Sequence, residues 1–574
     1  MINALKKINF LITKRQRKGL VILTLLLFAG MILEIFGLGI LIPVISILMD
    51  PEMIDKNPFI LSIKILFNDF SHQKFILFFL LATVFLYSIK TIFLIFLTHK
   101  QNRFLNNTIA YISNNLFSIY LNQPYEFHIK RNTSELIKNL QVEINLLSAF
   151  LQSLITVFIE GGFMLSIIAT LIYIEPFGAI FIGLIYGFLS VLFLQFTKKK
   201  INQWGKFRQK LDNQVSKIAL EGIGGIKDIL ILGKASFFVD EFSKKNYFKS
   251  RINSNQSTIS QIPRFYFELI SIIGLVTFIL FLLFEGKDLT IIITTLGVFV
   301  AATFRMIPSL NRIIAASQSL KYYKSSLDII YNETKGFGKV NFNHLEKFNF
   351  KNKIELKNIH FNFNNSINIL NGINLTIRKG ETIGIIGESG SGKSTLIDLI
   401  LGLHLPTSGE ILIDSVPDFQ MSQSWRNKIG YVSQAIYLTD DTIENNVAFG
   451  LPNNKIDKAR VIEVIKQVQL EKFTTNLELG LNTTVGERGI QLSGGQMQRI
   501  GIARALYNHP NILILDEATS ALDIKTESDV MKSVDNLKGD KTVIIITHRL
   551  KTLRKCDTIY RLVDGRIKMV PITI

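Results

Sequence analysis

The chain has 574 residues, which is too long for one hydrophobic core, so two or more domains are expected. Hydrophobic residues make up 48% of the chain and 44 residues are Phe; this composition excludes an ordinary soluble protein and indicates a membrane protein. The net charge of +19 would suit nucleic acid or anionic lipid, but Lys and Arg cluster beside apolar runs. Membrane orientation explains them, and no nucleic-acid partner is expected.

Six apolar runs are long enough to cross a bilayer. They lie at about residues 19–49, 75–98, 147–174, 177–197, 264–284 and 289–316. A basic segment precedes the first run, and long basic connections alternate with very short ones, so the positive-inside rule places the long connections and both termini in the cytoplasm. The long connections are periodic, which predicts helices that continue into the cytosol and turn near residues 122–127 and 221–227.

An apolar cluster at residues 59–67, on the outer side, is too short to span a membrane. A helix in the outer interface and a loop packed on the other helices both fit it. The transmembrane domain is therefore assigned to residues 1–331 and a polar linker to 332–352. From 353 to 574, short β-rich runs alternate with helices, which predicts an α/β domain.

This second domain contains a phosphate-binding loop pattern between an apolar strand and a helix. That setting aims backbone N–H groups and the positive end of a helix dipole at a phosphate, which a Gly/Ser-rich turn elsewhere would not do. Lys393 would reach the β- and γ-phosphates of ATP or GTP, and Ser394 would bind Mg²⁺. The loop residues are Gly387, Glu388, Ser389, Gly390, Ser391, Gly392, Lys393, Ser394 and Thr395.

Two further motifs follow in order along the domain. Leu492-Ser493-Gly494-Gly495-Gln496 precedes a helical run, and the apolar strand that begins at Ile512 ends in Asp516 and Glu517. Together with the phosphate loop, these motifs resemble the ATP-binding cassette (ABC) ATPases over roughly residues 350–572. The resemblance implies a membrane all-α domain of six helices with long cytosolic extensions, the ABC exporter fold, fused to an α/β P-loop cassette.

The resemblance also implies roles for individual residues. Asp516 would hold Mg²⁺ together with Ser394 and Gln434, and Glu517 would orient or deprotonate the attacking water. His548 resembles the switch histidine that contacts the γ-phosphate. The other residues expected around the nucleotide are Phe363, which would stack on adenine, the signature residues Ser493, Gly494, Gly495 and Gln496, and Asp523 of the D-loop.

In this family the signature faces the phosphate loop of a second nucleotide domain. The chain has one such domain and six spans, so pairing is needed to complete two ATP sites. A homodimer is expected, and the sequence leaves a heterodimer open.

Cations inside the spans are candidates for substrate contact. Lys90 lies 16 residues inward from Lys74, and Arg305 lies 16 residues inward from Leu289, so both are about 24 Å deep. Arg312 lies two turns deeper than Arg305. A basic wall in a cavity would suit phosphate or pyrophosphate. The alternative is that Lys90 and Arg305 reach the inner interface, or pair with Glu34 or Glu160.

The membrane half carries a second, less specific resemblance. Residues 305–312, residues 325–331 and the outer apolar cluster resemble the bacterial lipid-linked oligosaccharide flippase of protein N-glycosylation. This implies ATP-driven movement of a polyprenyl-pyrophosphate-linked glycan from the cytoplasmic to the periplasmic leaflet of the bacterial inner membrane. The alternatives are an exporter of another lipid, a peptide or a drug, and, in a different class, a membrane-anchored regulatory ATPase.

Overall fold

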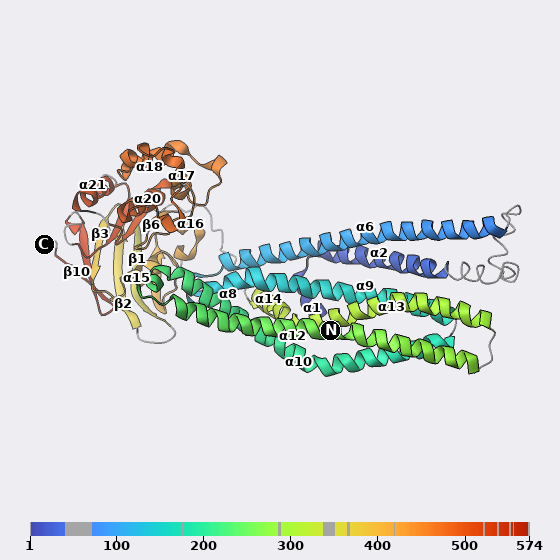
Figure 1. Ribbon diagram of the computed structural model, residues 1–574. Coiled ribbons are helices and arrows are strands. Elements are labelled where there is room, and N and C mark those ends of the chain that lie inside the picture. Colours follow the sequence, from blue (N-terminus) through green and yellow to red (C-terminus); the bar gives the residue numbers. More distant parts are fainter. Residues whose placement is uncertain are drawn as a thin grey trace. The chain divides into compact units, whose positions relative to one another are not determined.

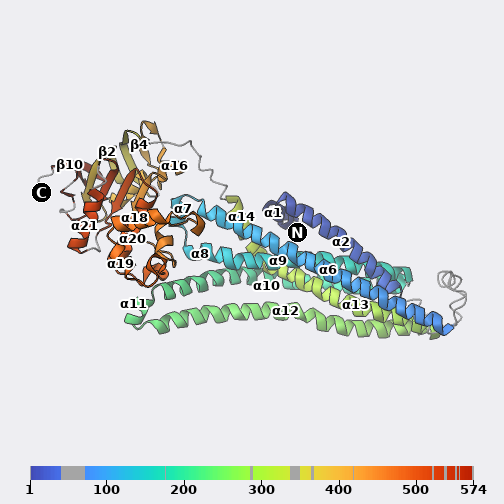
Figure 2. The ribbon, with the colours of Figure 1, turned by 90° about the horizontal axis from the view of Figure 1, so that it is seen from above.

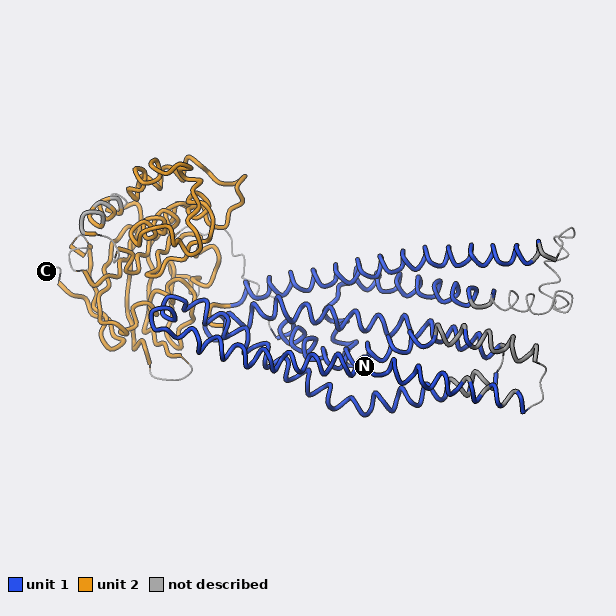
Figure 3. The backbone as a smooth tube through the Cα atoms, viewed as in Figure 1, with its two compact units in different colours: residues 1–123, 128–340 blue, residues 124–127, 341–574 orange. Residues whose placement is uncertain are grey.

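The computed structural model describes residues 2–40, 72–174, 176–284, 289–336, 350–363, 368–417, 419–519, 523–535, 539–549, 553–554 and 556–571. The chain divides into two compact units, residues 1–123 with 128–340 and residues 124–127 with 341–574 (Figure 3). The outer apolar cluster, the linker residues 337–349 and the end of the first predicted span lie outside the described residues.

The first unit is helical (Figures 1 and 2). Its elements are α1 (Ile2–Leu11), α2 (Lys14–Gly39), α6 (His72–Leu121), α7 (Tyr125–Lys130), α8 (Thr133–Lys138), the π-helix η1 (Asn139–Glu143), α9 (Ile144–Ile174), α10 (Pro176–Gly224), α11 (Ile226–Ile231), α12 (Ala235–Phe284), α13 (Leu289–Tyr322) and α14 (Lys324–Gly336). The first residues of α7 belong to the second unit.

The predicted continuation of the membrane helices is confirmed. α6, α10 and α12 are 50, 49 and 50 residues long, about 75 Å each, which is far more than a bilayer requires. They end where turns were expected, since α6 stops at Leu121 and α10 stops at Gly224. α14 runs through Gly336, so the first five residues of the predicted linker are helical.

Among the described residues, three helical stretches are long and apolar enough to cross a membrane: Lys14–Gly37, Ile76–Leu121 and Thr133–Tyr173. They coincide with the first three predicted spans. The other three predicted spans fall within α10, α12 and α13 and stay predictions. α2, α6 and α9 pack on one another, and α10 packs on α12 and α13.

The second unit has two sheets. A parallel core lies in the order β9-β3-β8-β7-β6, with β10 antiparallel at the β9 edge, and the other sheet is antiparallel in the order β2-β1-β4-β5. The strands are β1 (Lys353–Asn362), β2 (Asn368–Arg378), β3 (Thr382–Gly387), β4 (Ser408–Ile413), β5 (Val416–Pro417), β6 (Ile429–Val432), β7 (Ile512–Asp516), β8 (Thr542–Ile546), β9 (Thr558–Val563) and β10 (Arg566–Val570).

Short helices cover these sheets. They are α15 (Lys393–Ile400), η2 (Phe419–Met421), α16 (Gln423–Arg426), α17 (Ile443–Val447), η3 (Asn453–Lys455), α18 (Lys458–Gln467), α19 (Glu471–Thr475), η4 (Gly480–Asn482), η5 (Glu487–Gly489), α20 (Gly494–Tyr507) and α21 (Ile524–Asp535). α15 follows β3 directly, as the phosphate-loop pattern predicted.

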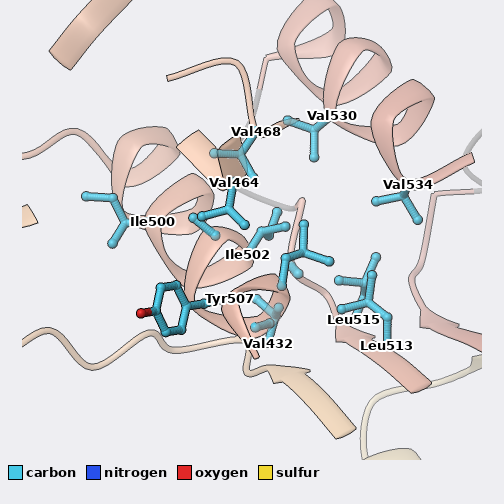
Figure 4. Close-up of a cluster of buried hydrophobic side chains, with 14 of the residues drawn as sticks. Val432, Val464, Val468, Ile500, Ile502, Tyr507, Leu513, Leu515, Val530 and Val534 are labelled. Carbon is cyan, nitrogen blue, oxygen red and sulfur yellow. The ribbon is translucent and has the colours of Figure 1, made fainter. Parts of the chain in front are cut away.

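Two apolar cores hold this unit together. One lies between β1–β4 and α15 and includes the fully buried Trp425. The other joins the large sheet to α18, α20 and α21, where Val464, Ile502 and Leu513 meet (Figure 4). All five residues of β7 and of β8 are buried, so the ends of these strands are rigidly placed.

Candidate functional site

Four parallel strands bring the predicted ATP-site residues to one edge of the large sheet. β3 ends at Gly387, β7 ends at Asp516, β6 leads into Gln434, and β8 leads into His548. Because parallel strands end on the same side, residues that are distant in sequence meet there, and ligands of α/β proteins bind at this edge.

The phosphate loop forms a cradle of backbone. Gly390 and Gly392 have φ of +82° and +101°, which side chains rarely adopt. A Cβ on Gly392 would lie 2.9 Å from Leu370 Cδ2, and one on Gly387 would lie 2.5 Å from Leu562 O. The loop therefore needs glycine at these positions.

The polar groups of the loop suit an anion. Lys393 is buried, and its Nζ donates to the carbonyls of Gly387 and Glu388 at 2.8 Å each. The Ser391 hydroxyl is buried and has no hydrogen-bond partner among the described residues. The Lys393 ammonium group, which bends back onto the loop, and the Ser391 hydroxyl both lie at the start of α15. A nucleotide phosphate would bind to groups of this kind.

Glu517 lies at the centre of a contact network. Its Oε1 is 2.8 Å from His548 Nε2, and its Oε2 accepts a hydrogen bond of 2.9 Å from Gln434 Nε2. Its backbone has φ of +48°, an uncommon conformation for a residue with a side chain, and its N–H donates to Ile546 O at 2.9 Å. The sheet edge thus fixes the direction of this carboxylate.

A buried acidic pair lies beside this network. Burial, followed by the neighbouring Glu517 carboxylate, raises the pKa of Asp516 above its usual range. Burial and the charge of Asp516 raise the pKa of Asp398, in α15, to about 6. Tyr431 donates a hydrogen bond of 3.4 Å to Asp516 Oδ2. A cation at Asp516 would relieve this crowding of carboxylates.

Sequence reasoning did not single out Asp398 or the role of Tyr431. Tyr431 stands three residues before Gln434, and Asp398 stands one turn beyond Ser394, so their positions in the sequence close to predicted site residues could have pointed to them. His404 was also missed. Its ring lies 5.5 Å from that of Phe363 and 5.7 Å from that of Tyr125, and burial lowers its pKa.

Phe363, the predicted adenine platform, lies at the end of β1, and β2 begins beside the phosphate loop, since Ile369 approaches Gly392. The Phe363 side chain is partly exposed, at 37%, and packs edge-on against Phe361 and His404. Stacking of this ring on adenine stays a prediction.

The signature segment is pre-formed by a capping box. Ser493 Oγ accepts from Gln496 N at 3.2 Å, and Gln496 Oε1 accepts from Ser493 N at 2.8 Å. Ser493 and Gly494 are exposed at the start of α20. Asp523 is also exposed, and the preceding D-loop residues 520–522 lie outside the described residues.

No group of three or more His, Cys, Asp or Glu side chains in the described part of the chain is arranged to hold a metal. Mg²⁺ in nucleotide sites is commonly held by one or two protein groups and the phosphates. Ser394 and Asp516 at one sheet edge fit that smaller requirement.

The intramembrane cations are partly paired. Lys90 Nζ lies 3.1 Å from Glu34 Oε2, and both side chains are buried. Arg312 Nε lies 2.8 Å from Glu160 Oε1 in an ion pair, and Ser309 Oγ donates a hydrogen bond of 2.7 Å to the other oxygen of the same carboxylate. Lys90 thus pairs with Glu34, which was the alternative to a position in a substrate cavity. The side chain of Arg305 lies outside the described residues.

Comparisons with known proteins agree with this architecture. A family profile described as the ABC transporter transmembrane region matches residues 20–306, and one described as ABC transporter matches residues 370–520. The chain is 32% identical over 473 residues to the ATP-dependent lipid A-core flippase of Saccharophagus degradans, covering 80% of this chain and 78% of that protein. The chain belongs to the ABC transporter family.

The fold of this ABC transporter is that of an exporter half-transporter. The structure of a bacterial Atm1-family ABC exporter with ATP bound superposes with a TM-score of 0.74 and 22% identity, covering 96% of this chain and 94% of that one. The cassette identifies this transporter as an ATP hydrolase.

Proposed function

We propose that this ABC transporter works as a homodimer that moves a polyprenyl-pyrophosphate-linked oligosaccharide from the cytoplasmic to the periplasmic leaflet of a bacterial inner membrane. The observation that carries the proposal is the environment of Arg312. Its side chain is 48% exposed, and Glu160 engages its Nε, while the two terminal nitrogens have no partner among the described residues.

An arginine that is paired with protein through Nε only can bind a pyrophosphate through its two terminal nitrogens. Ser309 binds the Glu160 carboxylate, and that carboxylate pairs with the Arg312 guanidinium, so little side-chain entropy is lost when an anion binds to the other edge of the guanidinium. Arg305, two turns away on the same helix, would add a second cation. Lys90 is paired with Glu34 on α2, so its contribution would be to hold α2 against α6.

The similarity to the lipid A-core flippase supports a lipid cargo. The match to the lipid A-core flippase spans 473 residues, more than the 222 residues of the predicted cassette domain, so it extends into the membrane half. That protein is named for a lipid, and for this chain a lipid cargo rests on the similarity alone. The geometry of Arg312 is the reason for proposing a pyrophosphate group on the lipid.

At the ATP site, this chain's residues would divide the work. Lys393 and the loop N–H groups would bind the phosphates, and Mg²⁺ at Ser394 and Asp516 would neutralise their charge. Glu517, oriented by Gln434 and His548, would accept a proton from the attacking water. The signature of the partner protomer would close the site, because Ser493 and the N–H groups of α20 form an anion site.

The test is transport by the purified protein in liposomes containing a fluorescent lipid-linked oligosaccharide, with the leaflet of the probe followed upon ATP addition. Wild type is expected to move the probe, and the Arg305→Gln/Arg312→Gln double variant is expected to lose most transport. Arg264→Gln, which removes an exposed arginine on α12, is the matched control.

Normal transport by the double variant would contradict a substrate role and leave the arginines as interfacial anchors. If wild type moved another amphiphile but not the lipid-linked oligosaccharide, the transporter would be an exporter of a different class. ATP hydrolysis without movement of any amphiphile would favour the regulatory ATPase.

A further inference from the structure

An apolar cavity of about 300 Å³ lies between α1, α2, α6 and α9. Its volume is at the lower end of the range for small-molecule sites. Leu5 and Ile8 of α1 form one wall, and Leu23, Leu97 and Phe158 contribute from the three longer helices. Sequence analysis did not predict α1 or this cavity.

The cavity is elongated along α6. Its lining residues on that helix run from Leu97 to Thr108 on one face, which corresponds to about 16 Å of helix. Thr24, Gln101 and Thr108 are the polar residues in an otherwise apolar lining. Thr108 is the last of them along α6 and forms the polar end of the cavity, where α1 joins α2.

Thr108 supplies an independent sign of a ligand. It is 2% exposed, and its hydroxyl has no hydrogen-bond partner among the described residues. Thr83, Thr91 and Thr98, on the same helix, each donate to the carbonyl four residues earlier. A buried hydroxyl that forgoes this local bond is costly unless another acceptor is present.

The polar end of the cavity carries a strong positive charge. No acidic residue precedes Glu34 in the sequence, whereas six basic residues lie between Lys6 and Lys18. Lys6, Lys14, Arg15 and Lys18 are exposed and make no ion pair with another described residue. Arg17 lies one turn before Leu20, which lines the cavity, and its Nη2 donates to Asn9 O at 2.8 Å, joining α2 to α1.

We propose that this cavity binds one acyl chain of an anionic phospholipid of the cytoplasmic leaflet, with the lipid phosphate against the basic α1–α2 junction and an ester oxygen near Thr108. A neutral ligand would leave the cations unused, and a peptide segment would bring more polar backbone than this lining satisfies. Juxtamembrane basic clusters attract anionic lipid. This site is separate from the proposed pyrophosphate site and does not depend on the cargo.

The test uses the full-length protein in phosphatidylcholine nanodiscs containing either a photoactivatable phosphatidylglycerol or a photoactivatable phosphatidylcholine with identical chains. Cross-linked peptides are mapped by mass spectrometry. In wild type, phosphatidylglycerol is expected to label the lining of α1, α2, α6 and α9 several-fold more than phosphatidylcholine does.

Leu23→Trp fills the cavity and is expected to reduce this labelling to the phosphatidylcholine level. Ile22→Trp places the same ring on the exposed side of the same helix and is expected to leave the labelling unchanged. Thr108→Val, which keeps the side-chain volume and removes the hydroxyl, is expected to lower the labelling several-fold. This variant tests the proposal independently if Leu23→Trp fails to fold.

Equal labelling by the two lipids would overturn the proposal and indicate ordinary boundary lipid. Labelling that survives both Leu23→Trp and Thr108→Val would place the lipid elsewhere on the helices. Because the readout is lipid binding, neither result depends on whether the protein transports lipid-linked oligosaccharide.

Discussion

Glu517 shows how a single residue in this transporter is fixed by its neighbours. Side chains from two other strand ends hold its two oxygens, and its backbone adopts a positive φ. Strain of this kind persists where surrounding structure maintains it, and it is concentrated at functional sites. Residue-scale predictions therefore concern the charge and direction of the carboxylates at this sheet edge.

Glu517→Gln is expected to lower ATP turnover by about 10²–10⁴-fold, because the amide cannot accept the proton of the attacking water. ATP binding should persist, since Lys393 and the loop backbone are unchanged. Turnover and nucleotide binding are measured on the same reconstituted sample, and Glu478→Gln, at an exposed position outside the ATP site, is the control. Hydrolysis at the wild-type rate would remove Glu517 from the mechanism.

Asp398→Asn is expected to stabilise the nucleotide-free cassette at pH 8 and to change little at pH 3.5. Folding raises the pKa of Asp398 from 3.8 to about 6, so the folded state favours the protonated carboxyl. Stability from this group is present below pH 3.8 and is lost as the pH rises through 6. Thermal midpoints of the two proteins across this window are the measurement, and a difference that does not grow with pH would contradict the assignment.

At the scale of elements, ion pairs join the helices of the first unit in addition to apolar packing, and the Lys90–Glu34 pair is buried. The Lys90–Glu34 pair links α6 to α2, and Gly37 leaves room for it, since a Cβ there would lie 3.4 Å from Lys90 Nζ. Glu160 links α9 to α13 through Ser309 and Arg312. Removing one partner of a buried ion pair strongly destabilises a protein, because the other charge is left buried and unpaired.

Glu34→Gln is accordingly expected to destabilise the transporter by on the order of 3 kcal/mol, because it leaves Lys90 buried without its counter-charge. The double variant Glu34→Gln/Lys90→Gln should recover most of this loss. The thermal midpoint in detergent and transport in liposomes are both measured. A double variant that is stable but fails to transport would assign Lys90 to substrate binding instead of helix packing.

At the scale of the whole molecule, one chain supplies one phosphate loop and one signature. Both are pre-formed, the loop by its glycines and the signature by its capping box. In the proposed dimer each site takes its loop from one protomer and its signature from the other. Two variants that each lack one half of the site can therefore complement each other in a mixed dimer.

Lys393→Ala and Ser493→Arg are each expected to abolish ATP hydrolysis as pure proteins. Mixing the two before dimer assembly should restore activity, because a mixed dimer contains one site with an intact loop and an intact signature. A single chain that carries both substitutions, mixed with wild type, should form no active mixed dimer. Failure of the first mixture to recover activity, with mixed dimers shown to form, would contradict sites shared between protomers.

The sequence by itself determined the two-part architecture, the long helices and the position of the ATP site. These features rest on local patterns: apolar runs of membrane length, and a glycine-rich loop between a strand and a helix, as at Lys393. The order of the motifs along the chain then identified the class of ATPase. Several motif residues lie at strand ends, so predicting where a strand ends also places these side chains.

Only the tertiary structure decided which charged groups meet. Lys90 and Glu34 lie 56 residues apart, and Arg312 and Glu160 lie 152 apart, so no local pattern could select these partners over others. The same holds for the cavity beside Thr108, which four helices enclose. Pairing energies depend on distance and burial, and both are set by packing between helices, not by the order of residues along the chain.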